Sequence, residues 1–168
     1  MIDLEELEKE CICKKMGNIR KECRNEYTVS EQSKSIKLER KNARESVLAI
    51  IIDGCIIKDN EPKCDALFLY EKETGKYSFL VELKGAGDIE KAFRQLSYTR
   101  DNRNEYKNII ERFKSLDNKK VNQKFVIVSN GMLSKPKLET LEKANKIRVK
   151  EVLHCEATTP IPDLKELI

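Results

Sequence analysis

The sequence predicts an α/β domain in which a mixed central β-sheet is flanked by helices. Three observations support this fold class. Apolar runs of strand length recur at residues 66–70, 77–84 and 124–129, and the stretches around them carry the apolar spacing of amphipathic helices. The chain of 168 residues is also long enough to form one domain with a buried core.

The N-terminal part of the chain is expected to be helical. Residues 1–30 are predicted to form an N-terminal helical segment whose apolar residues, such as Leu4, make only a thin stripe. A long helix is expected over residues 31–52, because apolar side chains including Val47 recur along one side of it. Gly54 would end this helix, since glycine is the usual left-handed terminator.

Strands and helices alternate in the rest of the chain. Strands are predicted at residues 55–58, 66–70, 77–84, 124–129 and 147–154. Helices are predicted from Asp88 onward, over 102–116 as its continuation or as a second helix, and over 135–145. The order of elements is then α, β, β, β, α, β, α, β. It defines one domain at 31–156 and leaves a C-terminal tail at 157–168.

Composition and charge limit the class of protein. Hydrophobic residues make up 39% and charged residues 37% of the chain, which is typical of a globular protein with a heavily charged surface. The longest apolar run, from Val47 to Ile52, is too short to span a bilayer. The acidic N-terminus is unlike a signal peptide. We therefore expect a cytoplasmic protein with no membrane association.

The six cysteines are expected to be reduced and free of metal. Cys11, Cys13 and Cys23 lack the paired spacing that structural zinc sites show in both halves of the ligand set. No feature of the sequence indicates secretion, and an even number of cysteines alone does not predict disulfides.

Charged residues gather at one end of a predicted hairpin. Side chains alternate along residues 77–84, so Glu82 and Lys84 point to the same face, and the hairpin would bring Asp65 beside them. Two carboxylates suit a hard cation such as Mg²⁺, and the backbone carbonyl of Leu83 would add a third oxygen. Lys84 would then position an attacking water. The alternative is that Glu82 and Lys84 are solvated residues on the outer face of an edge strand.

Asp65 followed by Glu82-Leu83-Lys84 on a hairpin resembles the signature of the PD-(D/E)XK nuclease superfamily, although Cys64 stands where the motif has its proline. The resemblance implies a restriction-endonuclease-like αβββαβ core, to which this chain adds one helix and one strand. It also implies metal-dependent hydrolysis of phosphodiester bonds, in DNA, with Mg²⁺ or Mn²⁺.

The resemblance extends to residues outside the hairpin. An acidic residue on the first helix often completes the site in this superfamily, and Glu45 is the candidate here, with Glu39 as the alternative. In the RecB-like branch a glutamine on the next helix lies close to the metal, and Gln95 is placed to do so. Tyr98 is a weaker match to the branch's tyrosine, because it follows Gln95 at a shorter spacing than usual. Small members of the superfamily act as symmetric dimers, so a homodimer is expected.

Basic residues flank the predicted site on both sides. The stretch 91–124 holds ten basic and four acidic residues, and phosphate neutralisation supplies most of the sequence-independent affinity for nucleic acid. The residues expected to contact nucleic acid are Arg94, Arg100, Arg103, Lys41 and Arg44. Two alternatives stay open: these are ordinary solvated surfaces, or the protein is a non-catalytic nucleic-acid-binding or protein-interaction module with a vestigial nuclease site.

Overall fold

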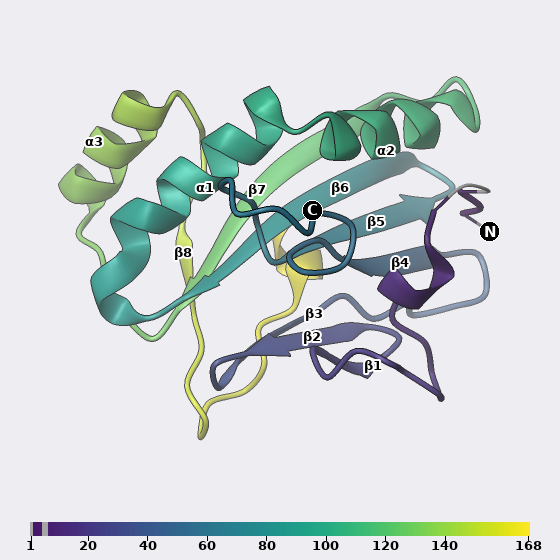
Figure 1. Ribbon diagram of the computed structural model, residues 1–168, viewed down its shortest axis with the longest axis horizontal. Helices are drawn as coiled ribbons and strands as arrows, with labels where there is room; N and C mark the ends of the chain where they lie inside the picture. Colours follow the sequence, from purple (N-terminus) through teal and green to yellow (C-terminus); the bar gives the residue numbers. More distant parts are fainter. Residues whose placement is uncertain (1, 5–6) are drawn as a thin grey trace.

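The computed structural model describes residues 2–4 and 7–168, and its elements form three layers (Figure 1). The middle layer is a five-stranded sheet whose strands, in spatial order, are β4 (Ser46–Ile51), β5 (Ala66–Lys72), β6 (Gly75–Lys84), β7 (Val121–Ser129) and β8 (Val152–His154). One face is covered by α1 (Ile89–Asn102) and α2 (Asn104–Ser115), with α3 (Lys135–Asn145) beside α1. The other face is covered by a small sheet of β1 (Cys23–Asn25), β2 (Thr28–Glu31) and β3 (Lys34–Lys37).

Strand directions make the central sheet mixed. β4 pairs with β5, and β5 with β6, in antiparallel fashion, whereas β6 with β7 and β7 with β8 are parallel. The predicted α/β class with a mixed sheet and flanking helices is therefore confirmed. None of the helices in the described residues is long and apolar enough to cross a membrane.

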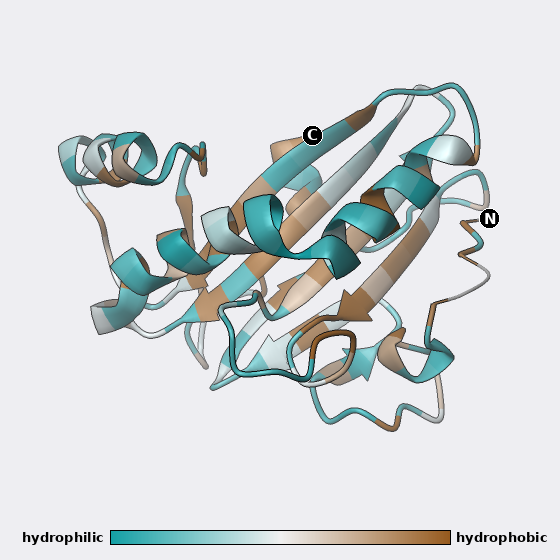
Figure 2. Ribbon diagram, turned by 45° about the horizontal axis from the view of Figure 1, so that its top comes forward, coloured by the Kyte–Doolittle hydropathy of each residue, from teal (hydrophilic) through white to brown (hydrophobic). Residues whose placement is uncertain are grey.

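The central strands fill two separate cores because their side chains alternate between the two faces. Leu67 and Leu80 are cross-strand partners that pack under the helices. Phe68 and Phe79, the next pair along, pack against the small sheet instead. Figure 2 shows the consequence: the central strands are largely brown, whereas the outer faces of α1 and α2 are teal.

The prediction of a long helix over residues 31–52 is wrong. That stretch holds a turn, β3 and β4, and the turn is formed by Gln32 and Ser33 with positive φ angles of 46° and 64°. In β4 the side chain of Ile50 lies under the helices, while Ile51 lies in the opposite core. A short apolar run that is buried on both faces carries no period, so periodicity alone does not separate it from a buried helix.

Three smaller expectations also need correction. The N-terminal segment 1–30 is not helical in its described part, which holds a single 3₁₀ turn at Lys9–Cys11 followed by β1 and β2. The strand predicted at 55–58 is a turn, and the strand predicted at 147–154 shortens to β8. The tail at 157–168 ends in a 3₁₀ helix, Leu164–Leu167, which packs into the core on the side of the small sheet.

Four of the six cysteines form disulfides, contrary to the expectation of reduced thiols. The bonded pairs are Cys11–Cys55 and Cys13–Cys23, and the free, buried thiols are Cys64 and Cys155. The N-terminal segment lies along the outer edge of β4, where Ile12 bridges Ile50 and the Cys13 N–H donates to the Ala49 carbonyl. This docking joins cysteines 44 residues apart, a proximity that spacing along the chain does not reveal.

Candidate active site

The predicted hairpin forms and brings Asp65 beside Glu82. Ala66 pairs with Val81, so Asp65 stands opposite Glu82 at the point where β5 begins. One carboxylate oxygen of Asp65 accepts a hydrogen bond of 2.7 Å from the backbone N–H of Leu83. Because the N–H and C=O of one strand residue point to the same side, the Leu83 carbonyl faces the side on which Asp65 lies.

Glu82 is a completely buried carboxylate with a close ion-pair partner. The Nζ atom of Lys84 lies 2.8 Å from its Oε1 atom, and the Glu82 side chain is 0% exposed. The backbone N–H of Asp65 also bonds to the Glu82 carboxylate and, like Lys84, favours its ionised form. Burial raises the pKa of Glu82 well above its usual range, and the neighbouring Asp65 raises it further. Such a group is costly to keep as an anion unless a cation is close to it.

Asp65 and Lys84 respond to the same environment. Burial raises the pKa of Asp65 to about 7, although the hydrogen bond from Leu83 opposes the shift. Burial lowers the pKa of Lys84, but the Glu82 carboxylate outweighs this effect and the net shift is upward. Lys84 therefore stays protonated between two carboxyl groups, where its charge favours their ionised forms.

Glu31, at the end of β2, is a further acidic residue that sequence reasoning missed. Burial raises its pKa, nearby Asp53 raises it further, and Lys84 lowers it. Glu31 and Asp53 also raise the pKa of Asp65. The small sheet thus supplies a carboxylate whose charge acts on Asp65 and Lys84. No sequence signal pointed to it, because residue 31 was assigned to the start of a helix.

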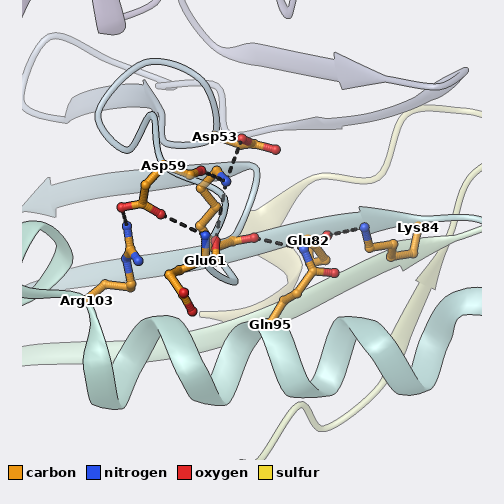
Figure 3. A network of polar contacts seen from close by, with 8 residues as sticks. Asp53, Asp59, Glu61, Glu82, Lys84, Gln95 and Arg103 are labelled. Atoms are coloured by element: carbon orange, nitrogen blue, oxygen red, sulfur yellow. Dashed lines mark hydrogen bonds and ion pairs between the residues drawn. The ribbon is translucent and has the colours of Figure 1, made fainter.

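Gln95 borders the candidate site from α1 (Figure 3). Its Nε2 atom donates a 2.9 Å hydrogen bond to the carbonyl of Lys63, two residues before Asp65. Its Oε1 atom is buried and has no hydrogen-bond partner among the described residues. Tyr98 donates to Glu61 at 3.3 Å and so contacts the loop before β5, not the paired carboxylates.

Glu45 does not belong to the site, contrary to the prediction. It immediately precedes β4, whose first residue pairs with Glu71, whereas the site lies at the opposite end of the same strands. Its carboxylate accepts hydrogen bonds from the Lys165 ammonium and the Lys41 backbone N–H. The alternative, Glu39, is exposed and forms an ion pair with Lys37. Both residues were misplaced because the helix that would have carried them is a strand and a loop.

The five predicted nucleic-acid contacts differ in their surroundings: two lie at the far end of the sheet, two are paired with carboxylates, and one is exposed. Lys41 and Arg44 precede β4 and therefore lie at the wrong end of the sheet. Arg103 is 6% exposed and forms an ion pair with Asp59, so it holds the loop before β5 and is not a free cation. Arg100 binds Asp101 and the Lys146 carbonyl. Arg94, on α1, is exposed as predicted.

The residues present fit a hard divalent cation. Two adjacent carboxylates and a backbone carbonyl on the same side form an all-oxygen donor set of the kind Mg²⁺ takes. The one group of three acidic or cysteine side chains in the described residues whose ligand atoms lie within 4.8 Å of one another is Glu8 with Cys11 and Cys55, and its two sulfur atoms are bonded to each other. A cavity of 660 Å³ between α3 and β8 lies away from the carboxylates.

Comparison of the chain with protein-family models, with curated proteins and with solved structures finds no match.

Proposed function

We propose that the protein is a metal-dependent nuclease of the PD-(D/E)XK type, acting on DNA. The observation that carries this proposal is Glu82, a fully buried carboxylate that lies next to the carboxyl group of Asp65 and in contact with Lys84. Burying two neighbouring carboxyl groups reduces stability, and such clusters are concentrated at functional sites. The hairpin geometry also supports a restriction-endonuclease-like core, here without its first helix.

Asp65, Glu82 and the Leu83 carbonyl would hold Mg²⁺ or Mn²⁺. The bound ion would polarise a phosphodiester group and lower the pKa of a bound water. Lys84 is held 2.8 Å from Glu82 and is 19% exposed, so its ammonium lies beside the carboxylate that would bind the ion. It would orient the attacking water or take up its proton, and it would offset charge that develops on the phosphate in the transition state.

Glu31 takes the place that was predicted for Glu45 in this proposal. It is part of the same electrostatic cluster as Asp65 and Lys84, and it would support a second ion or the attacking water. Gln95 acts through another residue: its amide fixes the Lys63 carbonyl and so the segment that leads into Asp65. A homodimer remains a prediction, which sedimentation of the purified protein would check.

The test is cleavage of supercoiled, linear, single-stranded and branched DNA by the purified protein with Mg²⁺, Mn²⁺ or a chelator. Glu82→Gln and Lys84→Met are expected to slow cleavage by about a hundredfold or more, with unchanged circular dichroism. Glu39→Gln is the matched control, because it changes the same chemical group on the exposed surface. Cleavage by Glu82→Gln at the wild-type rate would remove the mechanism.

The same assay decides which residue completes the site. Glu31→Gln is expected to slow cleavage, whereas Glu45→Gln is expected to lower stability and leave the rate of the folded protein unchanged. Metal-independent binding of DNA without cleavage by the wild type would instead favour the non-catalytic module with a vestigial site. In that case Lys84→Met would weaken binding no more than a change at any other exposed cation.

A further inference from the structure

The outer edge of β7 is open over most of its length. β7 pairs with β6 from Val121 to Ser129, but β8 pairs only with its last three residues, from Ile127 (Figure 1). No loop of the described residues forms a backbone hydrogen bond to residues 121–126. The opposite edge of the sheet differs, because Ile12 and Cys13 of the N-terminal segment bond to β4. An open edge presents unpaired N–H and C=O groups to any extended chain.

Two hollows border this open edge. The first, of 360 Å³, lies between the edge and the helices, near Tyr106 of α2. The second, also of 360 Å³, lies between the edge and Val149, on the way to β8. Gln123 and Phe125 line both hollows, so the two meet along β7. We call this continuous surface along residues 121–126 the β7 groove.

The β7 groove is strongly basic. Its single acidic side chain, Glu111, is already in an ion pair with Lys114. Six basic residues line it, three in each hollow: Arg100, Lys107 and Lys114 in the first, and Lys124, Arg148 and Lys150 in the second. Arg100 is paired with Asp101 and Lys114 with Glu111, so the cations without an ion pair among the described residues are Lys107, Lys124, Arg148 and Lys150.

We propose that the β7 groove binds an extended acidic segment of a partner protein, which adds to the sheet as a further strand. Strand addition would pair the unpartnered backbone groups of residues 121–126. Side chains of the added strand would alternate between the faces, so acidic side chains would meet cations in both hollows at once.

A nucleic-acid strand fits the β7 groove less well. The Arg100 guanidinium lies over the Phe125 ring, 5.7 Å from its centroid, and covers the aromatic face on which a base would stack. A phosphate backbone also has no donors for the strand carbonyls. The groove is separate from the candidate active site: Gln95 of α1 contacts Lys63 on one side of the helix, whereas Arg100 covers Phe125. The inference therefore does not depend on the proposed nuclease activity.

The test uses the full chain and a fluorescein-labelled peptide of about ten residues, the length of a long strand, made of paired glutamates and paired threonines. Fluorescence anisotropy at low salt measures the dissociation constant. Three probes are compared with it: the peptide with alternate backbone nitrogens methylated, a lysine and threonine peptide of the same pattern, and single-stranded DNA of about ten nucleotides.

The acidic peptide is expected to bind, and the methylated and basic peptides are not. Lys107→Glu combined with Arg148→Glu, one change in each hollow, is expected to weaken binding by about tenfold or more. Lys15→Glu combined with Arg24→Glu makes the same charge change at exposed positions outside the groove and should leave binding unchanged.

Three results would overturn the proposal. Equal binding of the methylated and unmodified peptides would show attraction of charge without strand pairing. Tighter binding of the DNA probe, lost in the Lys107→Glu and Arg148→Glu variant, would assign the groove to nucleic acid instead. The wild-type protein could also fail to bind the acidic peptide while its circular dichroism is normal. The β7 groove would then not be a site for an acidic strand.

Discussion

The two ends of β6 bury opposite charges in contrasting ways. At its start Lys76 is 0% exposed, yet its ammonium donates to the Phe113 carbonyl at 2.9 Å and lies 2.8 Å from Asp117. The ring of Phe113 lies under the same ammonium, 4.9 Å away. At its end Glu82 is equally buried, but its one ion pair, with Lys84, is opposed by the neighbouring carboxyl group of Asp65.

The contrast separates a structural charge from a candidate functional one. A buried charge whose donors and acceptors are satisfied is compatible with stability, and the contacts of Lys76 account for its burial. The contacts of Glu82 account for its burial less well, because burial and the neighbouring Asp65 carboxyl group raise its pKa more than Lys84 and the Asp65 backbone N–H lower it. A buried carboxyl group with so strongly raised a pKa is typical of a functional site.

The largest expected effect on stability is at the start of β6. Lys76→Met removes the ammonium from its buried partners and leaves the Phe113 carbonyl without a donor, so the free energy of unfolding should fall by about 3 kcal/mol. Urea denaturation measures the change. Lys120→Met, at an exposed position, is the control and should change stability little. An unchanged urea midpoint for Lys76→Met would show that the buried contacts of Lys76 do not stabilise the fold, and the contrast with Glu82 would be lost.

Removal of both charges at the other end of β6 should raise the free energy of unfolding instead of lowering it. The double variant Glu82→Gln and Lys84→Met takes away a poorly satisfied ion pair, and we expect the free energy of unfolding to rise by about 1 kcal/mol. The matched double variant, Lys76→Met and Asp117→Asn, should remain less stable than the wild type. A loss of stability in the first double variant would show that the Glu82 cluster is a structural ion pair.

Local patterns in the sequence were enough to predict the hairpin. Alternation over residues 77–84 put Glu82 and Lys84 on one face, and the Thr74-Gly75 turn fixed which residues stand opposite them. The structure pairs β5 and β6 in this way. These features depend on neighbours in sequence, so a single sequence carries them. The roles of the three side chains stay predictions, because geometry alone does not establish catalysis.

The parts that depend on distant contacts were not predictable. Residues 47–52 form a strand because two cores, built from distant helices and from the small sheet, bury them on both faces. Glu31 comes near Asp65 only because the small sheet docks under the central one. The bond from Cys11 to Cys55 likewise requires the N-terminal segment to lie along β4. None of these proximities leaves a periodic signal in the sequence.

In the pH dependence of stability, Asp65 and Asp117 should act in opposite directions. Burial raises the pKa of Asp65 from 3.8 to about 7. Between these values the folded protein keeps a proton that the unfolded chain has lost, so this group makes stability fall as pH rises. The Lys76 ammonium lowers the pKa of Asp117 from 3.8 to about 2, and in that window stability falls as pH falls.

Urea denaturation at a series of pH values distinguishes the two carboxyl groups. Asp65→Asn, whose amide oxygen still accepts the bond from Leu83, should flatten the decline between about pH 4 and 7. It should leave the fall in stability below about pH 4 unchanged. Asp117→Asn should reduce that fall below about pH 4 and should not affect the decline at higher pH. An Asp65→Asn variant that keeps the full decline would mean that its carboxyl group titrates normally. The Asp65 carboxylate would then be solvated, and the contrast between this end of β6 and the buried Lys76 would disappear.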